Sequence, residues 1–76
     1  MNAKQVSSIR RATNLLSQLY TTARLSFRVE ELPGGSMLFS ATTADSDLRW
    51  FEKHHNFFAI VGPRGGIRKY EGNMSL

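Results

Sequence analysis

The spacing of apolar residues changes near residue 24, and this change constrains the fold more than any other feature. Residues 4–23 repeat apolar side chains at steps of three and four, the period of a helix with one buried stripe. From residue 24 the period is two, because Leu25, Phe27 and Val29 alternate with polar residues as in a half-buried strand. The sequence therefore predicts a long N-terminal helix followed by a sheet.

Two turns rich in proline and glycine predict that the sheet consists of hairpins. Pro33-Gly34-Gly35 separates the strand at 24–30 from a second alternating run at 37–42. Residues 63–66, with the sequence PRGG, separate a strand at 56–62 from a last strand at 67–71. In this turn proline presets φ and Gly65 is expected to take a positive φ, which describes a three-residue hairpin loop with a bulge. It is not a P-loop, because Ile67 stands where that motif has lysine.

A short second helix is expected at residues 46–54, where N-cap residues precede the run DLRWFEKHH. The element order is then α-β-β-α-β-β. This order predicts an α+β fold: a four-stranded antiparallel sheet of two hairpins, with one long N-terminal helix and one short helix on one face. A chain of 76 residues is long enough for one domain, 1–76, and residues 72–76 are expected to be a flexible tail.

Composition excludes several classes of protein. The absence of cysteine rules out disulfides and thiolate metal sites. The longest apolar run, Phe57 to Val61, is too short to span a membrane. Lys4, Arg10 and Arg11 interrupt the N-terminus before an apolar signal segment forms. We therefore expect a cytoplasmic protein that needs no cofactor.

Charge is distributed unevenly along the chain. Ten basic and six acidic residues give a net charge of +4 and a pI near 10.1. Residues 1–29 contain five of the basic residues and no acidic one, whereas residues 30–76 are nearly balanced. This excess of positive charge in residues 1–29 favours polyanions or acidic protein surfaces as partners.

Two surfaces are candidates for binding. The polar face of the first helix offers Arg10, Arg11, Asn14 and Gln18, whose side chains can hydrogen-bond phosphates or base edges. An ordinary solvent-exposed face that happens to lack glutamate is an equally good interpretation of this pattern. If both helices cover one face of the sheet, the other face presents aromatic side chains between arginines. Proteins that bind single-stranded nucleic acid use such a face, because bases stack on the aromatic rings and the cations contact the phosphates. Such a patch is more often a protein interface, including that of a homodimer. A third alternative is that the strands do not pair as assumed here, so that these residues do not form one face. The predicted partner-binding residues are Arg10, Arg11, Asn14, Gln18, Arg24, Arg28, Phe58, Arg64, Arg68, Lys69 and Tyr70.

Metal binding and catalysis have little support. His54 and His55 are neighbours, so on a helix they point about 100° apart and cannot chelate one ion. Glu52 and His55 have a metal-site spacing, but such sites need further carboxylates. No G-x-S-x-G turn frames a nucleophile. Trp50 is interpreted first as a core-edge residue and otherwise as an anchor for a partner.

The sequence therefore predicts a small, basic, non-catalytic binding protein that acts by occupying a surface. Its expected partner is nucleic acid, or a protein surface that is acidic or normally binds nucleic acid. An alternative is an inhibitor or adaptor of the phage or mobile-element type that blocks a host complex, for example one used in defence. A small ribonuclease or toxin is the least favoured interpretation.

Overall fold

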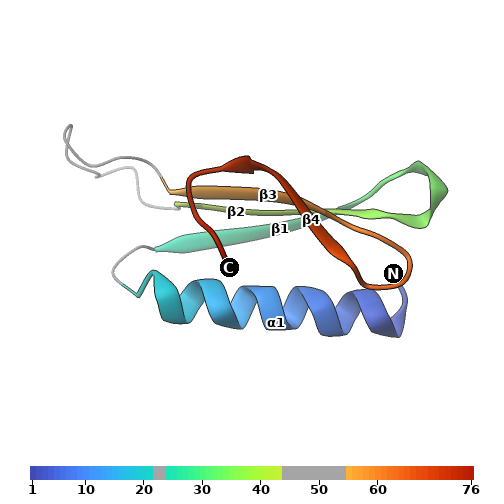
Figure 1. Ribbon diagram of the computed structural model, residues 1–76, viewed down its shortest axis with the longest axis horizontal. Helices are drawn as coiled ribbons and strands as arrows, with labels where there is room; N and C mark the ends of the chain where they lie inside the picture. The colour runs from blue at the N-terminus through green and yellow to red at the C-terminus, as the bar shows by residue number, and fades with distance from the viewer. Residues whose placement is uncertain (22–23, 44–54) are drawn as a thin grey trace.

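The computed structural model describes residues 1–21, 24–43 and 55–76, and it shows an α+β fold (Figure 1). Its elements are α1 (Ala3–Leu19), β1 (Leu25–Glu31), a 3-10 turn (Pro33–Gly35), β2 (Met37–Thr43), β3 (Asn56–Val61) and β4 (Ile67–Gly72). The strands form one antiparallel sheet in the order β1-β2-β3-β4, with α1 along one face. The predicted α+β fold is confirmed. The second helix expected at residues 46–54, and Trp50 with it, lie outside the described residues.

Both hairpins close as their turn residues predict. In the β3–β4 loop, the Gly62 N–H donates to the Gly66 carbonyl and the Gly65 N–H donates to the Gly62 carbonyl, each at 2.9 Å. Gly65 has a φ of 87°, which is the left-handed conformation that glycine adopts without strain. The β1–β2 turn closes in the same way, with the Leu32 N–H donating to the Ser36 carbonyl at 2.9 Å. The loop between β3 and β4 is therefore the expected three-residue loop with a bulge.

The core lies between α1 and one face of the sheet. Burial alternates along β2 and β3, as period two requires, so every second side chain faces the helix. Phe39 is fully buried, its ring stacked on Phe27 at 6.1 Å and edge-on to Phe57 at 6.0 Å between centroids. The buried hydrophobic residues are Ala12, Leu16, Met37, Phe39, Ala41, Phe57, Ala59, Val61 and Met74.

The helix is shorter than the sequence predicts. The apolar period continues to residue 23, but α1 ends at Leu19. Tyr20 closes the last helical bond, its N–H donating to the Leu16 carbonyl at 2.9 Å, and then leaves the helical conformation with φ −120° and ψ 57°. Threonines follow in the sequence, and β-branched residues lose side-chain freedom in a helix. Leu19, the last residue of α1, is 57% exposed.

The first turn of α1 is bonded to both hairpin turns. Asn2 and Gln5 form a capping box, in which each side chain accepts the backbone N–H of the other residue. Gln5 is only 1% exposed, and its Nε2 donates to the carbonyls of Gly35 at 2.8 Å and Val61 at 3.4 Å. The Asn2 Nδ2 donates to the Pro63 carbonyl at 2.7 Å. These bonds fix the N-terminal end of the helix against the turns.

The C-terminal segment makes more contacts than we expect of a flexible tail. Met74 is fully buried in the core, and its N–H donates to the Asn56 carbonyl at 3.0 Å. The Lys69 Nζ donates to the Met74 carbonyl at 2.6 Å, and the Ser75 N–H donates to the Tyr20 hydroxyl at 3.1 Å. Burial of a side chain the size of methionine stabilises by about 1.5–3 kcal/mol, which explains why this segment packs against the sheet.

Two glycines of equal φ provide a test of how closely α1 packs on the β3–β4 loop. A Cβ at Gly65 lies 3.0 Å from both the Lys4 carbonyl oxygen and the Ser8 Oγ, whereas a Cβ at Gly34, with φ 86°, meets nothing within 4 Å. Gly34→Ala is expected to lower the free energy of unfolding by about 1 kcal/mol, because alanine is strained at a positive φ. Gly65→Ala is expected to lower the free energy of unfolding by about twice as much, because the added Cβ also forces α1 to move away from the loop. Urea unfolding of both variants measures the difference, and equal losses would show that this close approach contributes nothing.

Candidate functional site

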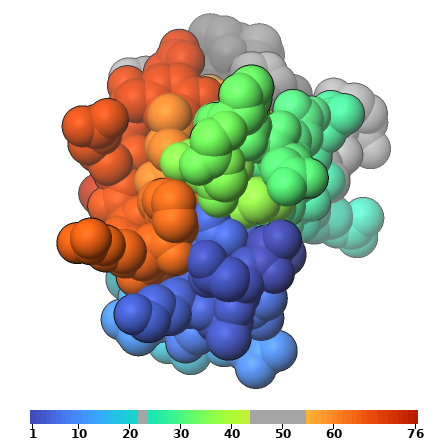
Figure 2. Space-filling view, turned by 90° about the vertical axis from the view of Figure 1, so that its right-hand side faces the viewer, coloured from blue at the N-terminus to red at the C-terminus, as the bar shows by residue number. Residues whose placement is uncertain are grey.

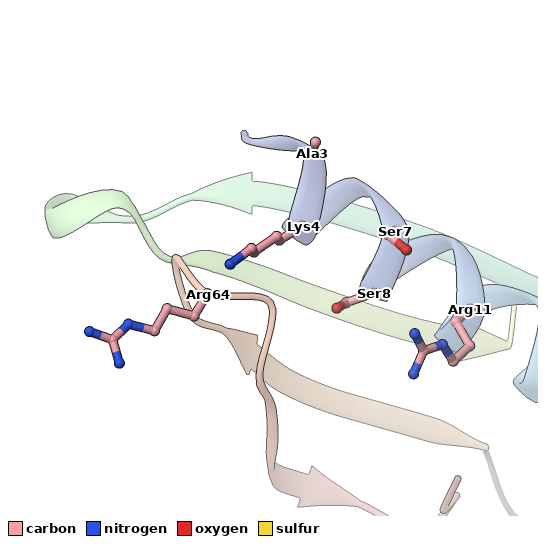
Figure 3. A pocket seen from close by; sticks show the side chains of 6 residues that line it. All are labelled: Ala3, Lys4, Ser7, Ser8, Arg11 and Arg64. Carbon is pink, nitrogen blue, oxygen red and sulfur yellow. The ribbon is translucent and has the colours of Figure 1, made fainter.

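The candidate site is a shallow groove between the N-terminal half of α1 and the β3–β4 loop. It has a volume of about 350 Å³. Figure 2 shows the first turns of α1, the β3–β4 loop (orange) and the β1–β2 turn (green) meeting at this end of the molecule. In Figure 3, Lys4, Ser8 and Arg11 follow one another along the helix, and Lys4 and Arg64 extend in the same direction. The groove is lined by Ala3, Lys4, Ser7, Ser8, Arg11 and Arg64.

The loop brings Arg64 to the helix because its backbone is bonded there on both sides of that residue. Before Arg64, the Pro63 carbonyl accepts the Asn2 side chain at 2.7 Å. After it, the Gly65 carbonyl accepts the Ser8 hydroxyl. Arg64 is therefore held at its backbone while its side chain is exposed to solvent.

The described residues that line the groove make it cationic. Three of the described residues that line it are basic, and none carries a carboxylate. Within residues 1–21, 24–43 and 55–76, eight residues are basic and three are acidic, and the one ion pair joins Arg28 to Glu30 at 2.9 Å. Lys4, Arg11 and Arg64 thus form no ion pair with an acidic residue in these ranges.

This arrangement suits the recognition of phosphate. Guanidinium groups bind phosphate oxygens through two parallel hydrogen bonds, and a lysine ammonium adds a mobile point charge. Ser7 and Ser8 also line the groove, and the Ser8 hydroxyl already donates to the Gly65 carbonyl. The groove also borders the first turns of α1, where the helix dipole is positive and the first turn itself contains no acidic residue.

The groove contains only part of the set that the sequence predicts. Arg11 and Arg64 both line it, although they are far apart in the chain. Arg10, Asn14 and Gln18 are exposed on α1 but do not line the groove. Arg10 points about 100° away from Arg11 around the helix. Asn14 and Gln18 lie on the same side of α1 as Arg11, but about one and two turns further along, beyond the groove. Sequence reasoning did not select Lys4, Ser7 and Ser8 as site residues, since nothing in the sequence shows where the loop docks.

The outer face of the sheet, which is the face opposite α1, holds most of the remaining candidates. Arg28 and Phe58 both lie opposite Ser40, so they occupy one row across the strands. The rings of Phe58 and Tyr70 lie 6.1 Å apart, and Tyr70 is 54% exposed. Arg68 lies opposite Ile60, on the same face. Arg24 is exposed just before β1 begins.

Two features of β4 differ from a regular alternating strand. A β-bulge between Phe58 and Ala59 leaves Tyr70 as the additional residue of β4, which places Glu71 opposite Phe58. Lys69 is paired with the buried Ala59, and its Nζ lies 5.9 Å from the centre of the Phe57 ring. Lys69 therefore belongs to the core side, where it bonds the Met74 carbonyl, and it is separated from Arg68.

The described residues bring no metal ligands together. No group of three or more His, Asp or Glu side chains in these ranges has the geometry to hold an ion. His55 contacts the Tyr20 ring, with centroids 5.6 Å apart. Glu52 and His54 lie outside the described residues.

Comparisons with known proteins give no relative from which a function is inferred. No protein-family profile, curated protein or solved structure matches the chain significantly. Of the helices formed by described residues, none is long and apolar enough to cross a membrane.

Proposed function

We propose that this protein is a non-catalytic nucleic-acid-binding protein that contacts the phosphate backbone through the groove between α1 and the β3–β4 loop. The observation that carries the proposal is that Lys4, Arg11 and Arg64 all line one groove, without a carboxylate among the described lining residues. A nucleic acid is the partner favoured here because it presents phosphates at regular spacing, so neighbouring groups reach several cations at once.

Binding of this kind depends on salt in a defined way. Each neutralised phosphate releases counterions, so the logarithm of affinity falls with the logarithm of salt concentration at a slope of about −0.9 per contact on duplex DNA. Contacts from Lys4, Arg11 and Arg64 then give a slope of about −2.7. Fluorescence polarisation of a labelled duplex between about 50 and 200 mM salt measures this slope and should show a loss of roughly fortyfold.

Neutralising the two groove arginines is expected to reduce both affinity and salt dependence. In the double variant Arg11→Gln, Arg64→Gln, the slope should fall by about two and the affinity by at least about tenfold at low salt. The matched control is Arg10→Gln, Arg24→Gln, which removes the same net charge from exposed positions outside the groove. The control should keep a slope close to that of the unmodified protein.

Two results would contradict the proposal. One is an equal loss in both double variants, because binding would then follow net charge and not the groove. The other is an absence of binding at low salt to single strands and duplexes of either nucleic acid. Circular dichroism of each variant establishes that the fold is retained, as expected for exposed side chains.

A further inference from the structure

The outer face of the sheet has charged residues at its two edges and three apolar residues on its central strands. On β1, the outward residues Arg28 and Glu30 lie at one edge, and their side chains are 78% and 47% exposed. On β4, Arg68 and Glu71 lie at the other edge, and both residues are exposed. Leu38, Phe58 and Ile60 lie half-buried between them on the two central strands.

The strand register arranges these charges in two rows. One row runs Arg28, Ser40, Phe58, Glu71 from β1 to β4. The next row runs Glu30, Leu38, Ile60, Arg68 in the same direction. Each row therefore has a basic residue at one edge and an acidic residue at the other, and the order is reversed between the rows.

This pattern is complementary to itself. When a second copy of the sheet is placed on the outer face by a two-fold axis parallel to the strands, β1 of each copy lies over β4 of the other. Each row then lies over the same row of the second copy. Arg28 meets Glu71 of the second copy, Glu30 meets Arg68 of the second copy, and Leu38 meets Ile60 of the second copy. Aligned packing of two sheets about 10 Å apart is a common arrangement of such faces.

We propose that two copies of this chain associate through the outer faces of their sheets, with cross-protomer pairs between Arg28 and Glu71 and between Glu30 and Arg68. The interface is isologous, as closed two-fold dimers are. In this arrangement both α1 helices remain on the outside of the dimer, so the proposal does not depend on the function of the groove.

The dimer is expected to be weak. Four strands about 4.8 Å apart and six residues of about 3.4 Å each give a sheet area of roughly 400 Å² per copy. Stable interfaces bury about 800 Å² per partner, so the association belongs to the transient class. We expect a dissociation constant between about 10 µM and 1 mM.

Exchange of the charges tests the proposed pairing. Sedimentation equilibrium without nucleic acid, up to about 1 mM protein, should show a monomer–dimer equilibrium. Glu30→Arg or Arg68→Glu alone places like charges opposite each other twice per dimer and should weaken association at least about tenfold. The double variant Glu30→Arg, Arg68→Glu exchanges the two charges and should restore association to within about threefold of the unmodified chain.

Two control variants are matched to these changes. Glu31→Arg makes the same charge change as Glu30→Arg, but Glu31 pairs with the buried Met37 and does not share the outer face. Arg10→Glu makes the same change as Arg68→Glu on exposed α1. Both should leave the dissociation constant within about twofold.

The proposal is overturned if the chain stays monomeric over the whole range, or if the double variant associates as poorly as the single variants. A monomeric chain in which Phe58→Ala and Tyr70→Ala lower affinity for single-stranded nucleic acid would instead assign this face to base stacking.

Discussion

Replacement of Phe39 by alanine is expected to remove a large share of the stability of the fold. Phe39 is fully buried in a central strand, between the rings of Phe27 and Phe57. A truncation of this kind costs about 3–5 kcal/mol, because it loses transfer free energy and leaves a cavity. A chain of 76 residues has a total stability of about 4–11 kcal/mol, so the loss amounts to between roughly a quarter and all of it. Urea unfolding followed by far-ultraviolet circular dichroism measures the loss.

Phe58→Ala is the matched control, because Phe58 is the next residue after Phe57 on the same sheet but faces outward and is only half-buried. Measured at low concentration, where the chain is monomeric, its cost should be about 1 kcal/mol. Similar losses in Phe39→Ala and Phe58→Ala would mean that the core does not lie on the α1 side of the sheet.

Replacement of Gln5 by leucine is the second change with a large expected effect. The size of the side chain is nearly unchanged, but the variant loses the bonds to the carbonyls of Gly35 and Val61 and the half of the capping box that accepts the Asn2 N–H. An unsatisfied buried polar group costs about 1–3 kcal/mol, and we expect a total loss of about 3 kcal/mol. The same urea titration, with the slope m checked for constancy, gives this value.

Gln18→Leu is the control for that substitution, since Gln18 is exposed on the same helix. Its effect on the free energy of unfolding should stay within about 0.5 kcal/mol. If Gln5→Leu were equally mild, the bonds between α1 and the two turns would contribute little, and packing alone would hold the helix to the sheet.

The strands and their turns are predictable from the sequence because their signals are local. Alternation places Phe39 and Phe57 on one face and Phe58 on the other, and the structure has this arrangement. Pro63 and Gly65 specify the loop between β3 and β4 through their own φ preferences. The end of α1 is not predictable in this way, because the apolar period continues past Leu19.

The groove is only partly predictable, because it depends on where α1 docks. The sequence marks Arg11 and Arg64 as cations, but it does not show that they lie at one groove with Lys4. A signal was present in Asn2 and Gln5, whose spacing is that of a capping box and which also bond both turns. The burial of Met74 has no such signal, because it follows from the return of the chain after β4.

The bonds that join α1 to the two turns connect residues far apart in the chain, with separations of 30 positions for Gln5 to Gly35 and 61 for Asn2 to Pro63. Contacts of such range form at a cost in loop-closure entropy and depend on the hairpins being in place. The cationic groove is consequently a property of the completed tertiary structure. A synthetic peptide of residues 1–21 contains Lys4 and Arg11 but lacks Arg64. A fragment without the β3–β4 loop therefore does not form the groove.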